Sequence, residues 1–99
     1  MMNFILAPSA IADLKEISDY FLQKNVEAGE QLFQKFNKRF ESLTRFPKLG
    51  KPYPKLHPEI RGLLEQNYII FYRISSESVE IVRIVDARRN LLELFKEER

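Results

Sequence analysis

The 99-residue sequence contains no cysteine and no tryptophan, only three glycines and a single histidine. Without cysteine the chain cannot form a disulfide, offer a thiol nucleophile or bind a metal through thiolates. Gly29, Gly50 and Gly62 are scattered, so no glycine-rich phosphate-binding loop is present. His57 lies between Leu56 and Pro58 without a second imidazole or a cysteine, which predicts a loop residue and not a metal ligand. We expect no metal and no other cofactor.

Long apolar runs are also missing. No stretch approaches the roughly 20 apolar residues that a membrane-spanning helix needs. Phe4–Ala7 supplies only four apolar residues, and no basic residue precedes them, so no secretory signal peptide is predicted. A single histidine also gives no basis for a serine–histidine–acid arrangement. We expect a cytoplasmic protein without a membrane partner or a small-molecule substrate.

The composition that remains is that of one soluble domain spanning residues 1–99, with 44% hydrophobic and 30% charged residues. The net charge of +2 is unevenly spread. Between Lys35 and Arg61 the chain has eight basic and two acidic residues, a net charge of +6, so the remainder carries −4. Such a basic belt suits a nucleic acid or an acidic protein partner, but a solvated helix face followed by a soluble loop has the same composition.

The segment from Ile60 to Arg89 predicts three short strands joined by tight turns. Tyr68–Ile74 is dense in aromatic and β-branched residues, and Val79–Val85 alternates well enough to be its neighbour. The serine-rich stretch between them is the turn. We predict an antiparallel meander.

Both faces of the central strand of this meander are apolar. Side chains alternate along a strand, so Ile69 and Phe71 point away from the face that carries Ile70 and Tyr72. A sheet with one solvated face would alternate between apolar and polar residues. The sheet therefore needs a cover on each side.

Two helices supply the first cover. Asn3–Ala7 predicts an edge strand that leads into an amphipathic helix over Pro8–Lys24. Asn25 is suited to end this helix and cap the next, which is predicted over Val26–Phe46 because Pro47 forbids its continuation. The apolar stripe of the second helix contains four phenylalanines. An antiparallel helical hairpin packed on the sheet gives an α+β fold.

The sequence offers two candidates for the cover of the other face of the sheet. The linker from Pro47 to Pro58 contains four of the five prolines, which predicts an extended segment that joins neither a helix nor a strand ladder. Leu91–Phe95 predicts a short final helix or a tail that could fold over the outer face. The alternative is that a separate protein chain covers that face.

Five arginines lie on or just after the predicted meander: Arg61, Arg73, Arg83, Arg88 and Arg89. Guanidinium groups bind phosphate or carboxylate bidentately, so they can grip nucleic acid, grip an acidic partner or stabilise charge during phosphodiester cleavage.

Some of these arginines also have a purely structural interpretation. Arg73 and Arg83 can pair across strands with Glu65 or Glu80. Arg88 and Arg89, in contrast, have only Asp86 as an obvious local partner. We predict that this adjacent pair contacts the target.

With these segments in view, the chain resembles the RelE/ParE superfamily of toxins, the poison half of type II toxin–antitoxin pairs. The resemblance covers nearly the whole chain and rests on SAIADLKEISDYF, SLTRFPKLGKPYP, IRGLL, NYIIFYRI and VEIVRIVDARR, in that order. It implies a β-α-α-β-β-β arrangement with an antiparallel sheet. It also implies a cognate antitoxin as partner, which we expect on the outer face of the sheet at Ile69, Phe71, Arg73, Val82 and Ile84.

Two activities divide the superfamily, and the resemblance implies one or the other. RelE-like members cleave messenger RNA on the ribosome, whereas ParE-like members inhibit DNA gyrase by binding it. Here Ile69 stands where RelE-like nucleases usually have an arginine, Asp86 where a histidine is frequent, and Phe95 about where they keep a tyrosine. Arg89 does match a basic family position. Loss of one acid–base group typically costs about 10² to 10⁴ in rate, so a nuclease lacking several is disfavoured.

We therefore expect a gyrase-binding inhibitor and not an enzyme, with a target surface made of Arg61, Arg83, Arg88 and Arg89. The first alternative is a RelE-like ribonuclease acting on messenger RNA at the ribosome, with Arg61, Arg88 and Arg89 as its catalytic candidates. The second is a relic of the fold that binds its antitoxin and is no longer toxic.

Overall fold

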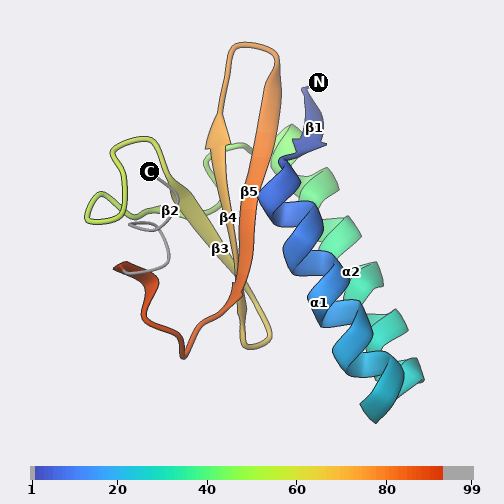
Figure 1. Ribbon diagram of the computed structural model, residues 1–99. Coiled ribbons are helices and arrows are strands. Elements are labelled where there is room, and N and C mark those ends of the chain that lie inside the picture. The colour runs from blue at the N-terminus through green and yellow to red at the C-terminus, as the bar shows by residue number, and fades with distance from the viewer. Residues whose placement is uncertain (1, 93–99) are drawn as a thin grey trace.

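The computed structural model describes residues 2–92 and contains two helices packed on one sheet (Figure 1). The elements follow the order β1 (Asn3–Leu6), α1 (Pro8–Lys24), α2 (Val26–Arg45), β2 (Lys51–Pro52), β3 (Arg61–Glu65), β4 (Tyr68–Ile74) and β5 (Ser78–Asp86). The predicted α+β class is confirmed. Neither of these two helices is long and apolar enough to cross a membrane.

Helix α1 has the boundaries that the sequence predicts. Pro8 occupies its first turn, where the missing N–H is not needed and the fixed φ suits a helix. The face turned to the sheet carries Ala10, Asp13 and Ile17. The buried aspartate on this otherwise apolar face has a specific partner in β5, described below.

Asn25 joins the two helices as a single residue. Its N–H donates to the Phe21 carbonyl at 2.8 Å, and its side-chain oxygen accepts from the Ala28 N–H at 3.0 Å. The predicted double role as stop and cap is therefore confirmed. Its backbone is extended, with φ of −167°, so the left-handed geometry that asparagine tolerates plays no part.

Helix α2 presents three of the four predicted phenylalanines, Phe33, Phe36 and Phe40, to the sheet. The prediction was wrong for Phe46, because the helix ends at Arg45, one residue before the predicted boundary, and Phe46 is 64% exposed. Phe46 is the C-cap of the helix, and its backbone is no longer helical, with φ −130° and ψ 75°. Near the other end, a Cβ added to Gly29 would lie 2.6 Å from Cβ of Phe21, so this glycine lets the two helices approach closely.

The sheet is mixed, with strand order β1-β5-β4-β3-β2. The antiparallel meander of β3, β4 and β5 is confirmed. β1 is an edge strand, as expected, but it runs parallel to β5, from the Asn3–Ser78 pair to the Leu6–Ile81 pair. The prediction of a wholly antiparallel sheet was wrong on this point, because the apolar pattern of a four-residue strand carries no information about its direction.

Side chains of α1 continue the edge of β5 beyond the end of β1. The Ser9 hydroxyl donates to the Val82 carbonyl at 2.6 Å, and a carboxylate oxygen of Asp13 accepts from the Ile84 N–H at 2.9 Å. These two bonds pair backbone groups that a longer β1 would otherwise pair. They also fix the helix against the strand.

A β-bulge interrupts the pairing of β4 with β5. Phe71 pairs with Arg83 and Tyr72 with Ile81, so Val82 is the extra residue. Beyond the bulge the alternation is shifted by one position, and Ile84 packs in the helix-side cluster. The expected position of Ile84 on the outer face was therefore wrong. Strict alternation along β5 cannot reveal the inserted residue.

The proline-rich linker, which was predicted to join no strand ladder, contains the two-residue strand β2. Lys51 pairs with Gly62 and Pro52 with Arg61, so β2 forms the other edge of the sheet. Proline is tolerated there because an edge strand needs hydrogen-bond donors on one side only. The Tyr53 N–H then donates to the Ile60 carbonyl at 2.9 Å and closes the loop between them.

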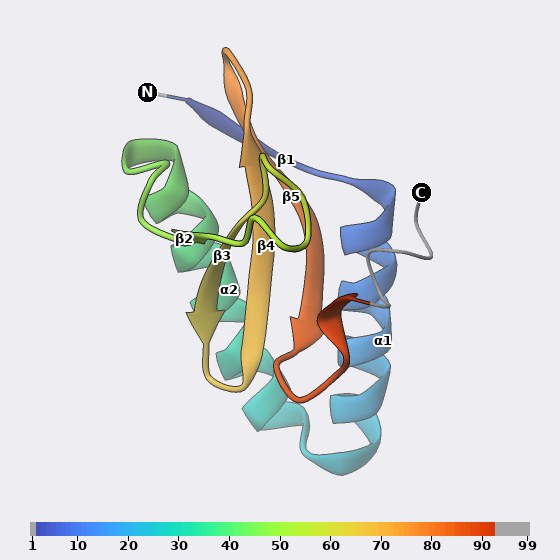
Figure 2. The same ribbon diagram turned by 90° about the vertical axis from the view of Figure 1, so that its left-hand side faces the viewer.

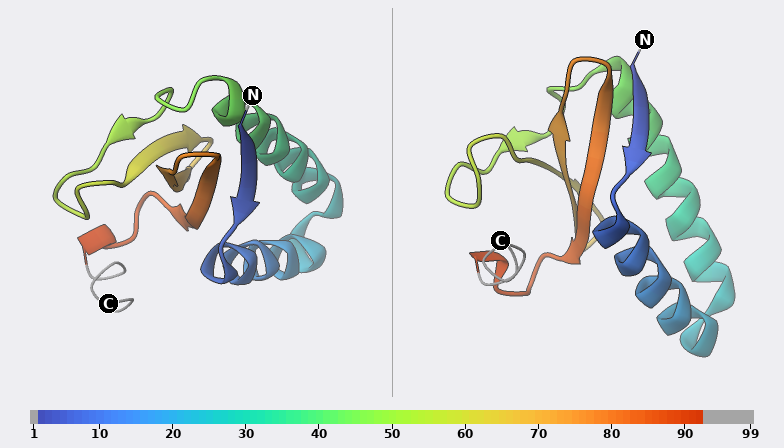
Figure 3. Two further views of the ribbon diagram at one scale, coloured as in Figure 1. Left: turned by 90° about the horizontal axis from the view of Figure 1, so that it is seen from above. Right: turned by 45° about the horizontal axis from the view of Figure 1, so that its top comes forward.

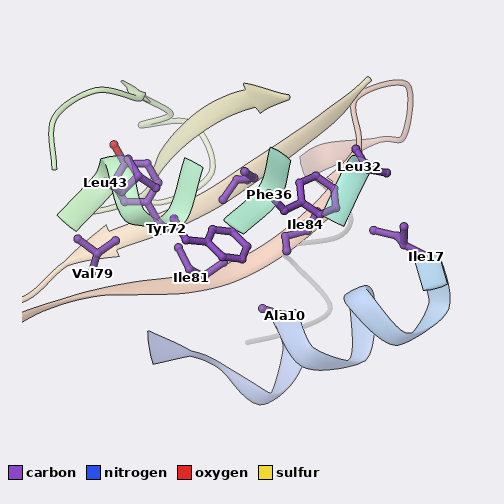
Figure 4. Packing of buried hydrophobic residues seen from close by; sticks show 11 residues of the cluster. Ala10, Ile17, Leu32, Phe36, Leu43, Tyr72, Val79, Ile81 and Ile84 are labelled. Atoms are coloured by element: carbon purple, nitrogen blue, oxygen red, sulfur yellow. The ribbon is translucent and has the colours of Figure 1, made fainter. Parts of the chain in front are cut away.

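The helix side of the sheet forms the larger core (Figure 4). Phe36 and Leu43 of α2 and Ile17 of α1 pack against Tyr72 of β4 and Ile81 of β5. Phe36 also stacks on Phe40, with ring centroids 6.4 Å apart. Burial of apolar side chains from both helices holds the hairpin against the sheet.

The opposite side of the sheet is covered by the linker. In Figure 2 the linker crosses in front of the strands, and Figure 3 shows it on the side away from the helices. Leu56 from the linker and Ile60, just before β3, pack with Ile69, Phe71 and Val85. The second cover is therefore the chain itself and not a separate protein.

The C-terminal segment contributes to this cover through Leu91, which packs against the second cluster. Residues 91 and 92 are helical, in the position predicted for a short final helix. The rest of that prediction, including Leu94 and Phe95, lies outside the described residues.

Candidate interaction surface

The end of the sheet where β4 begins and β5 ends gathers several polar and aromatic side chains. Tyr68 and Asp86 are paired across the two strands, and the chain turns away immediately after them at the lower end of the sheet in Figure 1. α1 passes the same end. We call this surface the arginine corner, made of Tyr20, Asn67, Tyr68, Asp86, Arg88 and Arg89.

Asp86 organises the turn that carries the two arginines. One carboxylate oxygen accepts from the backbone N–H of Arg88 at 2.9 Å, an Asx-type turn that aspartate forms readily. The Asp86 carbonyl accepts from the Arg89 N–H at 3.1 Å. Asn67 adds a side-chain hydrogen bond to the carboxylate at 3.4 Å, and its carbonyl accepts from the Ala87 N–H. The backbone of the corner is thus held in one conformation.

The Arg88 guanidinium lies against the same carboxylate, with Nε and Nη2 at 2.9 and 2.6 Å from the two oxygens. This hydrogen bond lowers the pKa of Asp86 below its ordinary range and raises that of Arg88. The Arg88 side chain nevertheless remains 81% exposed. Asp86 therefore orients the guanidinium without removing it from solvent. Arg89 is also exposed.

Two tyrosines border the arginines. Tyr68 is half-buried, with its ring edge-on to Phe36 at 5.8 Å. Burial raises its pKa, and the nearby Asp86 carboxylate raises it further. Tyr20 of α1 is exposed and close enough to both Tyr68 and Arg88 to influence their titration. Tyrosine and arginine together are the composition typical of binding hot spots.

The electrostatics of the corner favour binding over proton transfer. A carboxyl whose pKa is lowered is a poor proton acceptor at neutral pH, and a phenol whose pKa is raised is a poor source of phenolate. The exposed guanidinium groups, in contrast, can bind a carboxylate or a phosphate from a partner. Among the described residues no group of three histidine or acidic side chains could hold a metal ion.

Arg61, the first arginine predicted to contact the target, lies elsewhere and contacts the linker. Its Nε donates to the Gly50 carbonyl at 2.9 Å, and its Nη2 donates to the Lys48 carbonyl at 3.3 Å. These bonds tie the linker to β3. The structure does not bring Arg61 together with Arg88 and Arg89.

Arg83 and Arg73 form ion pairs within the chain. Arg83 makes a two-point contact with Asp13 at 2.8 and 3.1 Å, and both side chains are only 11% exposed. The predicted partners of Arg83 were therefore wrong, and its burial removes it from any target-binding surface. Arg73 pairs with Glu80 on the neighbouring strand, which confirms the structural interpretation of that residue.

The residues predicted to bind the antitoxin do not form an open apolar face. Ile69 and Phe71 are buried beneath the linker, Val82 is partly buried beside them, and Ile84 lies in the helix-side core. Arg73 is exposed at the edge of this region. The prediction of an open apolar face was wrong, because the linker buries the apolar side chains on the outer side of the sheet.

Sequence reasoning missed Tyr20, Asn67 and Asp13. Asp13 carried a usable signal, because a charged residue on the buried side of an amphipathic helix needs a partner. The spacing of Asp86 and Arg88 also indicates an Asx-type turn. Tyr20 had no such signal, since its proximity to the strand ends depends on the angle at which α1 crosses the sheet.

Comparison with known proteins agrees with this architecture. Residues 4–91 match the family described as the ParE toxin of the type II toxin–antitoxin system parDE. A 52-residue segment is 38% identical to Toxin ParE3 of Caulobacter vibrioides, and the aligned part spans about half of each chain. The fold is similar to a chain of the chromosomal ParDE system from P. aeruginosa, with a TM-score of 0.73, 25% identity, and coverage of 87% of this chain and 96% of that one.

Proposed function

Because the chain belongs to the ParE family of toxins of type II toxin–antitoxin systems, we propose that it stops growth by binding DNA gyrase in the cytoplasm and is neutralised by a cognate antitoxin. The arginine corner is the surface that contacts the gyrase. It acts by binding and not by a chemical step.

The main support for this proposal is the orientation and exposure of the Arg88 side chain. Its guanidinium is oriented by Asp86 and remains 81% exposed, on a turn whose backbone is fixed by hydrogen bonds. An oriented side chain loses little conformational freedom when a partner binds, so more of the contact energy remains as affinity. Arg89 and the two tyrosines extend the same surface.

Arg83 is buried and Arg61 has a structural role, so the proposed contact surface is limited to the C-terminal end of β5. Both arginines were candidates on sequence grounds, but their guanidinium groups are engaged by Asp13 and by linker carbonyls. Of the four arginines predicted to contact the target, Arg88 and Arg89 remain exposed to a large partner.

Ribosome-dependent cleavage of messenger RNA is the second candidate. Paired exposed arginines also bind the phosphates of RNA, which is the one observation in its favour. The pKa shifts of Tyr68 and Asp86 work against it, because each moves the group away from neutral pH.

Induced expression in bacteria, with and without the cognate antitoxin, tests these alternatives together. Growth should stop without the antitoxin and resume with it, a DNA damage response should appear, and transcript ends should show no codon-spaced cuts. The Arg88→Ala/Arg89→Ala variant, expressed at the same level, should allow growth. A Lys15→Ala variant serves as the matched control and should remain toxic, because Lys15 is an exposed residue of α1.

Other outcomes identify the alternatives. Codon-spaced cuts in translated messages without DNA damage would replace gyrase by the ribosome as target. Normal growth at full expression, with the antitoxin still bound, would mark the chain as an antitoxin-binding relic of the fold.

A further inference from the structure

A second exposed surface lies at the other end of the sheet, where β4 ends and α2 passes into the linker. Phe46, Leu49 and Ile74 are 64%, 46% and 37% exposed, and with Pro47 they line a shallow groove. None of the three belongs to either buried cluster. We call these three residues the apolar shelf. β4 separates it from the arginine corner, since Tyr68 begins this strand and Ile74 ends it.

The shelf is held rigidly from below. The Tyr72 hydroxyl is buried, accepts from the Gly50 N–H at 2.9 Å and donates to the Pro47 carbonyl at 2.6 Å. Arg61 binds two carbonyls of the same loop. A Cβ on Gly50 would lie 2.7 Å from the Gly62 carbonyl oxygen, so the loop is seated directly on β3.

This support explains why Phe46 and Leu49 stay outside. The Leu49 N–H donates to the Phe46 carbonyl at 3.0 Å, which closes a tight turn after α2. With the carbonyls of Pro47, Lys48 and Gly50 all anchored inward, the side chains at the tip of the turn point to solvent. Clustered exposed apolar side chains on a fixed backbone are a feature of protein interaction sites.

The charge around the shelf restricts its occupant. Arg45 and Lys48 also line the groove, and no acidic residue is found among its described lining residues. A second copy of this chain would place the same two cations against each other across a two-fold axis. A partner segment that combines apolar side chains with carboxylates matches both features of the surface.

We infer that the apolar shelf, with Arg45 and Lys48 at its rim, is a docking site for an acidic amphipathic segment of the cognate antitoxin. This inference rests on the proposed function, which supplies the antitoxin as partner. Tight neutralisation requires buried apolar anchors, and the arginine corner offers charge with little aliphatic surface. The shelf supplies these anchors at a distance from the surface proposed to contact gyrase.

The test measures binding of the full-length cognate antitoxin to purified variants of the full chain by calorimetry. Phe46→Ser/Leu49→Ser should weaken binding at least about 30-fold, as loss of a hot spot does. Arg45→Glu/Lys48→Glu should weaken it about 10-fold and reduce its dependence on salt. Leu22→Ser is the matched control, because Leu22 is 62% exposed on α1, and it should bind within about 2-fold of the wild type.

Each variant is checked by thermal unfolding, and Leu49→Ser alone provides a milder substitution that preserves the end of α2. Wild-type affinity in the shelf variants would overturn the inference. So would loss of toxicity with unchanged antitoxin binding, which would assign the shelf to the growth target. A wild-type dimer that the Phe46→Ser/Leu49→Ser variant dissolves would assign it to a second copy.

Failure of the proposed function gives a different result. If gyrase is not the target, the wild type leaves gyrase unaffected while the antitoxin titration still separates the shelf variants from Leu22→Ser. A wild type that binds no antitoxin would overturn the inference together with the antitoxin part of the proposed function.

Discussion

The two faces of the sheet are covered by different kinds of chain. One face, with Ile70 and Tyr72, packs on two regular helices, whereas the other, with Ile69 and Phe71, packs on an irregular proline-rich linker and Leu91. Both covers bury the strand residues almost completely. The difference shows that surplus apolar character on a strand does not by itself indicate a partner, because a linker without regular structure can serve as a cover.

This comparison also locates the surfaces that remain for partners. With both faces covered by the chain itself, the two surfaces proposed to bind partners lie at opposite ends of β4. One end carries the arginine corner, and the other carries the apolar shelf. Substitutions in the helix cover, at the contact between α1 and β5, in the linker cover and at the arginine corner should therefore have effects of decreasing size on stability.

Phe36→Ala should produce the largest loss of stability. Phe36 is 1% exposed and lies at the centre of the helix cover, so truncation leaves a cavity among rigid neighbours. We expect a loss of about 3 to 5 kcal/mol in the free energy of unfolding. Urea denaturation followed by circular dichroism measures it, with exposed Lys35→Ala on the same helix as control. A loss below about 1 kcal/mol would show that the helix cover is loosely packed.

Asp13→Ala tests the polar contact between α1 and β5. It leaves the Arg83 guanidinium with little solvent contact and the Ile84 N–H without its acceptor. Breaking a buried pair in this way typically costs about 3 kcal/mol or more. Asp13→Asn should recover part of this loss in the same denaturation experiment, because its oxygen can still accept from Ile84. Exposed Glu16→Ala is the control.

Leu56→Ala tests the linker cover. Leu56 is 7% exposed, but its surroundings are loop and can relax around a smaller side chain. We expect a loss of about 2 kcal/mol, at the lower end of the range for such truncations. In this variant, hydrogen exchange should be accelerated more at the linker amides than at the amides of α2. Equal protection of linker and helix would contradict the distinction between the two covers. Lys55→Ala serves as control.

Arg88→Ala/Arg89→Ala should have the smallest effect on stability. Both side chains are exposed, so the melting temperature should change by no more than about 3 °C. Without Arg88 the pKa of Asp86, lowered in the wild type, should rise toward its ordinary value of about 3.9 in an NMR titration.

The sign of the accompanying pH effect follows from the lowered pKa. A carboxyl with a lower pKa in the folded state stabilises the fold above its unfolded pKa, and this contribution is lost as the pH falls through the folded pKa. Any stability difference between wild type and variant should therefore appear at neutral pH and vanish in acid. A large loss at neutral pH would show that the pair supports the fold.

The parts of the fold that follow from periodicity were predictable from the sequence. The Phe36 and Phe40 stripe, the Asn25 joint and the bounds of β4 all follow from local rules of spacing and capping. The direction of β1 did not, because it depends on pairing between residues more than 70 positions apart, as between Asn3 and Ser78. The bulge at Val82 did not either, because an inserted residue leaves no mark in the apolar pattern of β5.

The candidate site shows the same division. Arg88 and Arg89 stood out because adjacent arginines follow a strand, and Asp86 was identified as their local partner. Arg83 looked equally available, but its burial depends on Asp13, which lies on another element. Phe46 and Leu49 were not recognised as a surface, because their exposure follows from hydrogen bonds that Tyr72 and Arg61 make to the linker.

The most direct test of the account is a gyrase supercoiling assay with purified protein. Wild-type chain should inhibit supercoiling, added cognate antitoxin should restore it, and folded Arg88→Ala/Arg89→Ala should inhibit at least about 30 times more weakly. Full supercoiling activity in the presence of excess wild-type chain would contradict the central claim. Equal inhibition by the double variant would show that the arginine corner is not the surface that contacts gyrase.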